Sequence, residues 1–482
     1  MAHTTARIGA VLALGAAARD AAAYEAAVDA RLDAQVYQVT SPYGAPILSR
    51  RRYTETLGVR VVDIQGAHDP GRGELLAVMR LRLDADFGQD PAERNAQAED
   101  RYVPGVSEMP LDLMMAYVEG RNYAGGHVGF RLGRQYVVDP LGFWSFDGAL
   151  VRLDTDAFVA FEAYGGFEQR GGLPLLSTSR FEGDGVFRGD RRGLDGNYWP
   201  AYLSEKSLAP AYGFSVASSG LSFLDARLTY RKVIDQDTVL VSPYPDARGE
   251  FATTSESRTS SERVGAAVVA TAKDLGSFRA DGVYDLYFQK PTEYSATADV
   301  RAVKDLSFGA GAEYFLPTFD GDSIFNWFSH EGTTTFTGRA RWSVTRRLAI
   351  GASGGVRRFG TDGLGTLTDT LASFDAAYRA PALELGLRGT DEEGSRGERR
   401  GADVFGRRTF QGGTWDTSVR LSLYQWADAL RPDRDATSFT YVLGGGFSPY
   451  RKTRVAVEFE HSINELAPER FRALATLDFT VL

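Results

Sequence analysis

Charged side chains recur at every second position in several segments of this sequence, always opposite a row of apolar residues. In Leu75–Phe87 the apolar row alternates with Arg80, Arg82 and Asp84, and Thr335–Thr345 sets Arg339 and Arg341 against apolar neighbours. A period of two places the two rows on opposite faces of a β-strand. Arg and Asp together in mid-strand suit a face that meets water, so their chemistry is solvation and charge rather than catalysis.

Any one of these charges is explained by solvation and by pairing across neighbouring strands. Together they predict a wet lumen, in which opposite charges create a transverse field that polar solutes cross and apolar solutes avoid. The residues predicted to line it are Arg80, Arg82, Asp84, Arg279, Asp281, Asp285, Asp299, Arg301, Arg339, Arg341, Arg420, Glu458 and Glu460.

Nucleophilic chemistry has little support in this sequence. His461 is followed by Ser462, but adjacent strand residues point to opposite faces, so Ser462 cannot serve His461 as a nucleophile. A His in an aromatic belt at a membrane rim explains His461 better, and we expect no enzyme.

Cofactor and metal sites have no better support. The chain has no Cys, which excludes disulfides, thiolate metal sites and covalently attached haem. The loop acids Asp320 and Asp322 lack the spaced ligands of a committed Ca²⁺ site. Gly351–Gly355 lies inside a strand pattern, where close strand packing is expected instead of phosphate binding. We therefore expect neither metal nor cofactor.

The elements that position the charges are predicted strands of roughly 11–15 residues, longer than the usual 5–6 of soluble sheets. Connections alternate between short turns such as Lys304-Asp305 and Arg346-Arg347 and long loops. The segments predicted as long are Gln169–Pro210, Gln236–Thr259, Asp320–Gly332 and Asp391–Arg399. This alternation is typical of bacterial outer-membrane barrels, with periplasmic turns and extracellular loops. We predict an all-β transmembrane antiparallel up-and-down barrel of about 22 strands, within a range of 18 to 22.

The amino terminus predicts the route to the membrane. Arg7, the apolar run Ile8–Ala18 and the small residues Ala21–Ala23 form a secretory signal pattern. We expect a signal peptide over residues 1–23 and a barrel over residues 24–482 in the bacterial outer membrane. The expected partners are outer-membrane lipid and lipopolysaccharide, the barrel insertion machinery and small polar solutes, with an oligomer possible. A net charge of −9 gives nucleic acid no electrostatic support.

The longest connection is the candidate for narrowing the lumen. Gln169–Pro210 carries Arg180, Arg188, Asp190, Arg191 and Arg192. A loop of this length either folds inward as a constriction or covers the outer mouth, and both alternatives stay open. The few tens of residues before the first strand are too few for a plug domain.

A family resemblance enters at Gly133-Arg134-Gln135 and Phe146-Asp147-Gly148. This pair of segments resembles the strand end and strand start of alginate-export and related porin barrels, over some 20 residues. That family's polysaccharide substrate is not carried over. Physically, Arg134 and Asp147 are expected to face each other in one hairpin and fix its loop.

A porin-like channel for polar or charged solutes is the function that these patterns favour. A structural sleeve around a periplasmic or surface partner is an alternative, and so is surface recognition through the long loops.

Overall fold

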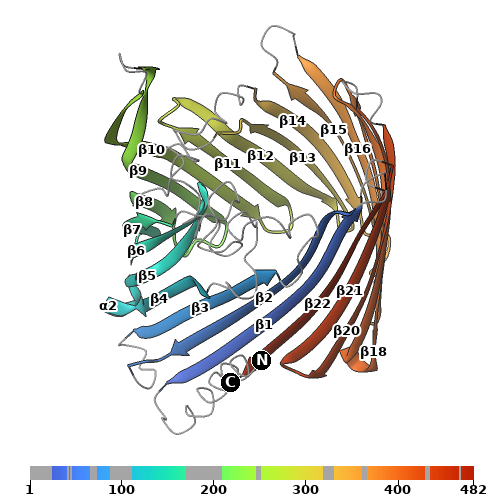
Figure 1. Ribbon diagram of the computed structural model, residues 1–482, viewed down its shortest axis with the longest axis horizontal. Helices are drawn as coiled ribbons and strands as arrows, with labels where there is room; N and C mark the ends of the chain where they lie inside the picture. Colours follow the sequence, from blue (N-terminus) through green and yellow to red (C-terminus); the bar gives the residue numbers. More distant parts are fainter. Residues whose placement is uncertain are drawn as a thin grey trace.

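The computed structural model describes residues 24–40, 43, 46–65, 73–86, 111–169, 209–245, 251–318, 331–360, 366–428, 435–465 and 468–481. They form one antiparallel sheet of 22 strands that curves round and closes on itself (Figure 1). Each strand pairs with the next along the chain, and β1 also pairs with β22 through a ladder from Val28–Val481 to Thr40–Glu469. The predicted barrel and its strand number are confirmed.

The strands are long enough to cross a bilayer at a tilt. They are β1 (Glu25–Thr40), β2 (Pro46–Val62), β3 (Glu74–Asp86), β4 (Leu111–Asn122), β5 (Val128–Asp139), β6 (Gly142–Asp154), β7 (Val159–Glu168), β8 (Pro210–Ser218), β9 (Leu224–Pro245), β10 (Phe251–Ala272), β11 (Gly276–Asp285), β12 (Lys290–Val303), β13 (Leu306–Phe315), β14 (Thr333–Trp342), β15 (Leu348–Phe359), β16 (Leu367–Ala380), β17 (Leu383–Gly394), β18 (Gly397–Phe410), β19 (Trp415–Ala427), β20 (Ala436–Tyr450), β21 (Thr453–Asn464) and β22 (Glu469–Val481). Two single-turn helices, α2 (Tyr123–Gly126) and η6 (Gln411–Gly413), complete short connections.

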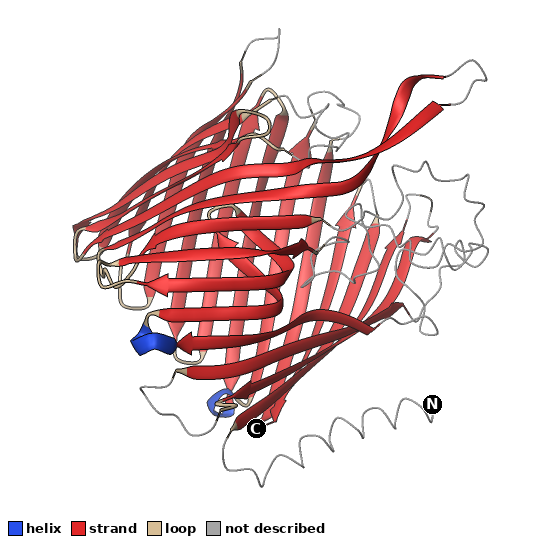
Figure 2. Ribbon diagram, turned by 90° about the vertical axis from the view of Figure 1, so that its left-hand side faces the viewer, coloured by secondary structure: helices blue, strands red, loops and turns tan. Residues whose placement is uncertain are grey.

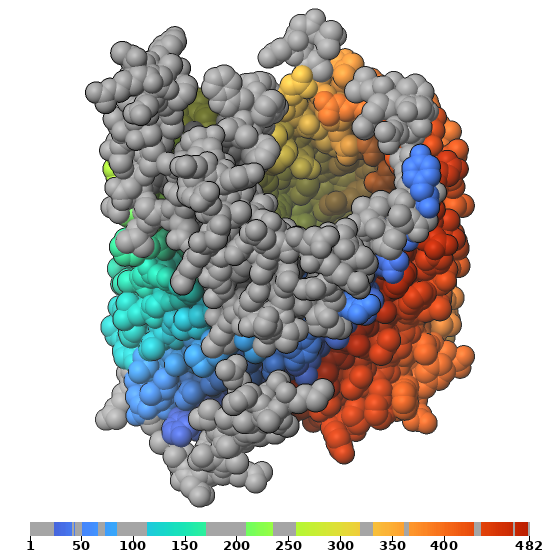
Figure 3. Space-filling view, viewed as in Figure 1, coloured from blue at the N-terminus to red at the C-terminus, as the bar shows by residue number. Residues whose placement is uncertain are grey.

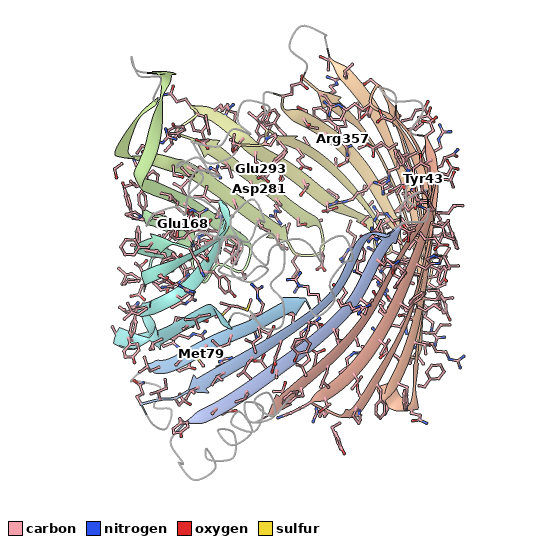
Figure 4. The ribbon with its side chains drawn as sticks, viewed as in Figure 1. Tyr43, Met79, Glu168, Asp281, Glu293 and Arg357 are labelled. Atoms are coloured by element: carbon pink, nitrogen blue, oxygen red, sulfur yellow. The ribbon has the colours of Figure 1, made fainter. Side chains whose placement is uncertain are left out.

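Large apolar side chains stand exposed along one face of almost every strand. Met79 on β3 (labelled in Figure 4), Leu387 on β17 and Leu421 on β19 all belong to this outer row. Aromatic residues gather at both ends of it, with Tyr294 stacked on Tyr314 at one end and Trp415 on Phe447 at the other. An apolar band between two aromatic girdles is the outer surface of a transmembrane barrel.

No helix in the described part of the chain is both long and apolar enough to cross a membrane.

Two predicted long loops are wrong. Most of Gln236–Thr259 belongs to β9 and β10, which pair with each other well beyond the ends of β8 and β11 (Figure 2). Asp391–Arg399 is likewise strand except for the two-residue turn Ser395-Arg396. In both segments the hydrophobic alternation fades where the strands leave the lipid, but the backbone ladder continues because it needs no apolar row.

A charged substitution should have different effects on the outer and inner faces of the barrel. Adjacent residues of β19 test this difference. Leu421 is exposed on the outer row, whereas Ser422 donates to Asp403 at 2.5 Å on the opposite face. Leu421→Arg puts a cation in lipid, and we expect it to lower the free energy of unfolding by about 2–4 kcal/mol. Ser422→Arg places the same side chain beside a carboxylate and should change that free energy little.

Urea unfolding of both variants in lipid vesicles measures the difference. Equal losses for the two positions would contradict the assignment of outer and inner faces.

Candidate functional site: a lumen narrowed by an inward hairpin

The inner face of the barrel is lined by ion pairs between neighbouring and next-neighbouring strands. Arg339 on β14 donates to both carboxylate oxygens of Asp299 on β12, at 2.9 and 2.5 Å. Arg80 on β3 reaches Asp29 on β1 at 3.2 Å, across the intervening β2. Such pairing holds long side chains flat against the wall and leaves room between the walls.

Apart from Asp84, the residues predicted to line the lumen lie on the face opposite the apolar row. Arg279 pairs with Asp281 at 3.2 Å, Arg301 approaches Asp274 to 4.0 Å, and Arg472 contacts both Glu458 and Glu460. Register places Arg341 opposite Ser307 and Arg420 opposite Val442 on the same face. Arg82 is buried. Asp84 pairs with Thr54 through its backbone, and its side chain lies outside the described part.

Asp285 is buried at a turn and is held there by hydrogen bonds and an ion pair. It ends β11 and is 1% exposed. Its carboxylate accepts hydrogen bonds from the backbone N–H groups of Tyr287 and Phe288 and pairs with Arg263 at 3.1 Å. The alternation of Ser277–Gln289 therefore stops here, because Asp285 turns the chain.

The hairpin of β5 and β6 leaves the barrel wall and enters the lumen. β5 pairs with β4 only from Phe130 to Arg134, and β6 pairs with β7 only from Phe146 onward. Beyond these points the two strands pair with each other up to the turn at Pro140-Leu141, although Ser145 still accepts a backbone bond from Gln169. In Figure 1, β5 rises into the space that the barrel encloses. We call residues 135–146 the inward hairpin.

The bend begins at Gly133, Arg134 and Gln135. Gly133 has φ +120°, a conformation that side chains disfavour. Arg134 grips Asp147 through two hydrogen bonds of 2.7 and 2.8 Å, as expected from the sequence, and its Nη1 donates to the carbonyl of Leu113 on β4. That bond occupies a carbonyl on β4 beyond the last residue pair between β4 and β5. Gln135, 1% exposed, donates to the carbonyl of Gly148.

An apolar cluster holds the inward hairpin against β7–β9. Trp144 stacks on Phe146 with ring centroids 4.4 Å apart, and Tyr164 packs against both rings. Val233 of β9 completes the cluster, and the indole N–H of Trp144 donates to Glu168 at 2.8 Å. Because such packing requires water to be excluded, this side of the lumen is filled.

Two cavities border the inward hairpin. One of about 870 Å³ lies between its tip and the inner faces of β9–β13, where Asp281 and Glu293 stand close together (Figure 4). The other, of about 480 Å³, lies against β4–β6 and contains Arg121, Arg131 and Glu119. Arg152 and Arg227 line both. The hairpin thus stands between two charged, water-accessible spaces.

The inward hairpin was not predicted from the sequence as a constriction. The long loop assigned that role, with Arg180, Arg188, Asp190, Arg191 and Arg192, lies outside the described residues. A signal was nevertheless present in Tyr136–Phe146, where Val137-Val138 and Phe143-Trp144 put apolar residues on both faces. A wall strand between lipid and a wet lumen is apolar on one face only, so apolar residues on both faces indicate that this segment leaves the wall.

His461 and Ser462 point to opposite faces, as expected. The imidazole of His461 meets the Tyr441 ring edge-on at 5.4 Å in the outer aromatic row. Ser462 accepts a hydrogen bond from Thr440 at 2.8 Å on the inner face. Gly351 and Gly355 occur within β15 as expected, and an added Cβ at Gly355 would meet the backbone of Phe336.

Closure, the apolar outer band and its aromatic girdles make this protein a transmembrane β-barrel of the bacterial outer-membrane type. No protein-family model matches the chain, and no curated protein matches its sequence. Among solved structures, it is similar to OccAB4 of Acinetobacter baumannii (8% identity, TM-score 0.45, covering 95% of this chain and 98% of that one). It is also similar to OpdK of Pseudomonas aeruginosa, solved with vanillate (9% identity, TM-score 0.43, covering 95% of this chain and 98% of that one). The translocation pore of the P pilus usher PapC is similar at 8% identity and a TM-score of 0.43, with 95% of this chain and 99% of that one covered.

At such identities, what passes through those proteins says nothing of this chain. The resemblance of Gly133–Gln135 and Phe146–Gly148 to alginate-export barrels stays a prediction.

The bend itself can be tested through Gln135. Gln135→Leu removes the side-chain donor to the carbonyl of Gly148, and the net loss of one hydrogen bond costs about 0.5–1.5 kcal/mol. We expect the free energy of unfolding to fall by that amount and amide exchange to accelerate in the inward hairpin.

Gln35→Leu on β1 is the matched control, because Gln35 is only partly buried and lies opposite Leu474 in the wall. Hydrogen exchange by mass spectrometry compares the two variants. Unchanged protection of the hairpin in Gln135→Leu would show that Gln135 does not hold the bend.

Proposed function

We propose that this protein is an outer-membrane channel that passes small polar or charged solutes through a water-filled lumen. The observation that carries the proposal is the exposure of charged side chains inside a closed barrel. Arg279 is 65% exposed and Arg339 53% exposed, although both are on the inner face. Guanidinium groups with that much contact to solvent require water beside them, and water inside a barrel makes a conduit.

The solute path in this proposal runs between the inward hairpin and the walls that it does not touch. Figure 3 shows a hollow in the molecule, with the yellow and orange strands of the far wall visible inside. The hairpin fills the side next to β7–β9, so it sets the free cross-section. Ion pairs along the remaining wall favour solutes that keep their hydration or exchange it for charged groups. Export through a signal peptide at residues 1–23 belongs to the same proposal.

Surface recognition is the second candidate, and the β9–β10 hairpin favours it. β8 accompanies β9 only to Val233, and β11 accompanies β10 only from Arg263. Apart from a backbone bond from Leu286 to Glu262 at its base, the remainder of both 22-residue strands pairs only with itself in the described part of the barrel and stands beyond the rim (Figure 2). Exposed strand edges of this kind accept another strand from a partner.

Planar-bilayer recording tests the channel, and a shortened hairpin tests where it is narrow. Tyr136 and Ser145 are a register pair, so an Asn-Gly turn in place of Val137–Trp144 removes all but the base of the inward hairpin from the lumen. We expect discrete conductance steps for the natural chain and steps about twofold larger for the shortened one, because conductance follows the open cross-section.

The control replaces the existing two-residue turn Ser395-Arg396 by the same Asn-Gly. It should leave conductance unchanged. A silent natural barrel that still shows heat-modifiable migration would refute the channel and favour surface recognition. Equal steps in all three proteins would place the narrow point elsewhere.

A further inference from the structure

The tip of the inward hairpin is fastened to the wall by one charged side chain. Arg231 of β9 donates from Nη2 to the carbonyl of Leu141 at 3.1 Å. Its Nη1 is 3.7 Å from the carboxylate of Asp139, and its guanidinium lies 5.1 Å from the centre of the Trp144 ring. One side chain thus contacts both strands of the hairpin and its turn.

These contacts are shielded from water. The Asp139 side chain is 0% exposed and that of Arg231 is 9% exposed. Tyr164 donates to the same Asp139 carboxylate at 3.3 Å, and Asp139 also accepts the backbone N–H of Leu141. A buried carboxylate without its cation is strongly disfavoured, whereas water in the lumen would solvate the same carboxylate. Loss of the cation therefore favours movement of the tip into the lumen.

The tip also rests on a glycine of the neighbouring strand. A Cβ at Gly265 of β10 would lie 2.7 Å from Cδ2 of Leu141 and 3.1 Å from the carbonyl carbon of Pro140. The turn is therefore seated directly on the inner face of β10, one strand further round the barrel than Arg231. Glycine leaves the space that this seat needs.

We infer that Arg231 is the positioning residue of the constriction: it holds the inward hairpin in its seat on β10 and thereby sets the width of the passage. This inference rests on the proposed channel function for its consequence, but the fastening itself does not. The Arg231 side chain need not touch the solute. It acts by fixing Asp139, Leu141 and Trp144.

Arg231→Met tests the inference against Arg263→Met. Arg263 is the register partner of Arg231 on β10 and also faces the lumen, but it pairs with Asp285 and not with the hairpin. The two variants lose the same charge at nearly the same place. We expect conductance steps about half as large, or interrupted by closures, in Arg231→Met alone, because only this variant lets the tip leave the wall and move into the open cross-section. Equal changes in both variants would assign the effect to charge and overturn the inference.

A cysteine pair provides a readout that does not depend on conduction. Because the chain has no Cys, Leu141→Cys with Gly265→Cys introduces the only two thiols, at the seat of the tip. Mild oxidation should cross-link them quickly in the presence of Arg231 and several-fold more slowly with Arg231→Met. Oxidation of the Met variant should also return its conductance to that of the natural chain, and reduction should lower it again.

Arg231→Lys keeps the test open if the Met variant does not fold. Lys retains the charge but cannot contact Leu141, Asp139 and Trp144 together, so the cross-linking rate should fall between the other two. Cross-linking that is equally fast in all three proteins would show that Arg231 does not hold the tip. A natural chain that cross-links as expected but never conducts would refute the channel and leave the fastening intact.

Discussion

A peptide group in the hydrocarbon core of a membrane has no water to bond, so its partner must come from the protein itself. This requirement explains the 22-stranded ladder and the β1–β22 seam that closes it. Closure in turn fixes the side chains, because a pleated strand sends alternate residues to opposite faces. With Leu421 directed to lipid, Ser422 must face inward, and the same rule governs the paired charges on β12 and β14.

Closure of so many strands creates a second problem, because the enclosed space is too wide for wall side chains to fill. The inward hairpin reduces that space without breaking the first requirement. Its two strands keep bonding each other as they leave the wall, so they carry their own ladder inward. The residues of β4 before Ala116 lose β5 as a hydrogen-bonding neighbour. There the Arg134 side chain donates a hydrogen bond to the Leu113 carbonyl. A side chain thus satisfies a backbone carbonyl that has lost its partner strand.

The barrel, its strand number and its two faces could be predicted because apolar and polar side chains alternate along each strand. The apolar ones face lipid and the polar ones face the lumen. It also predicted the Arg134–Asp147 pair, since both residues belong to one hairpin with a short connection. The protruding strands β9 and β10 were taken for a loop, because hydrophobic patterning ends at the membrane surface while pairing continues. The constriction was assigned to the longest loop on length alone. Arg231 could not be found at all, because Asp139 and Leu141 lie 90 or so residues away and only the inward bend brings them together.

The seam between β1 and β22 also has a consequence for the order of events during biogenesis. It joins Val28 to Val481, so almost the whole chain forms the loop that this contact closes. Neighbouring hairpins form from local contacts, whereas a contact of this sequence separation is slow and comes late. Until it forms, the sheet has two unpaired edges, each ready to add a foreign strand. Closure of the seam removes both edges at once, so it ends the period in which the barrel can pair with a foreign strand.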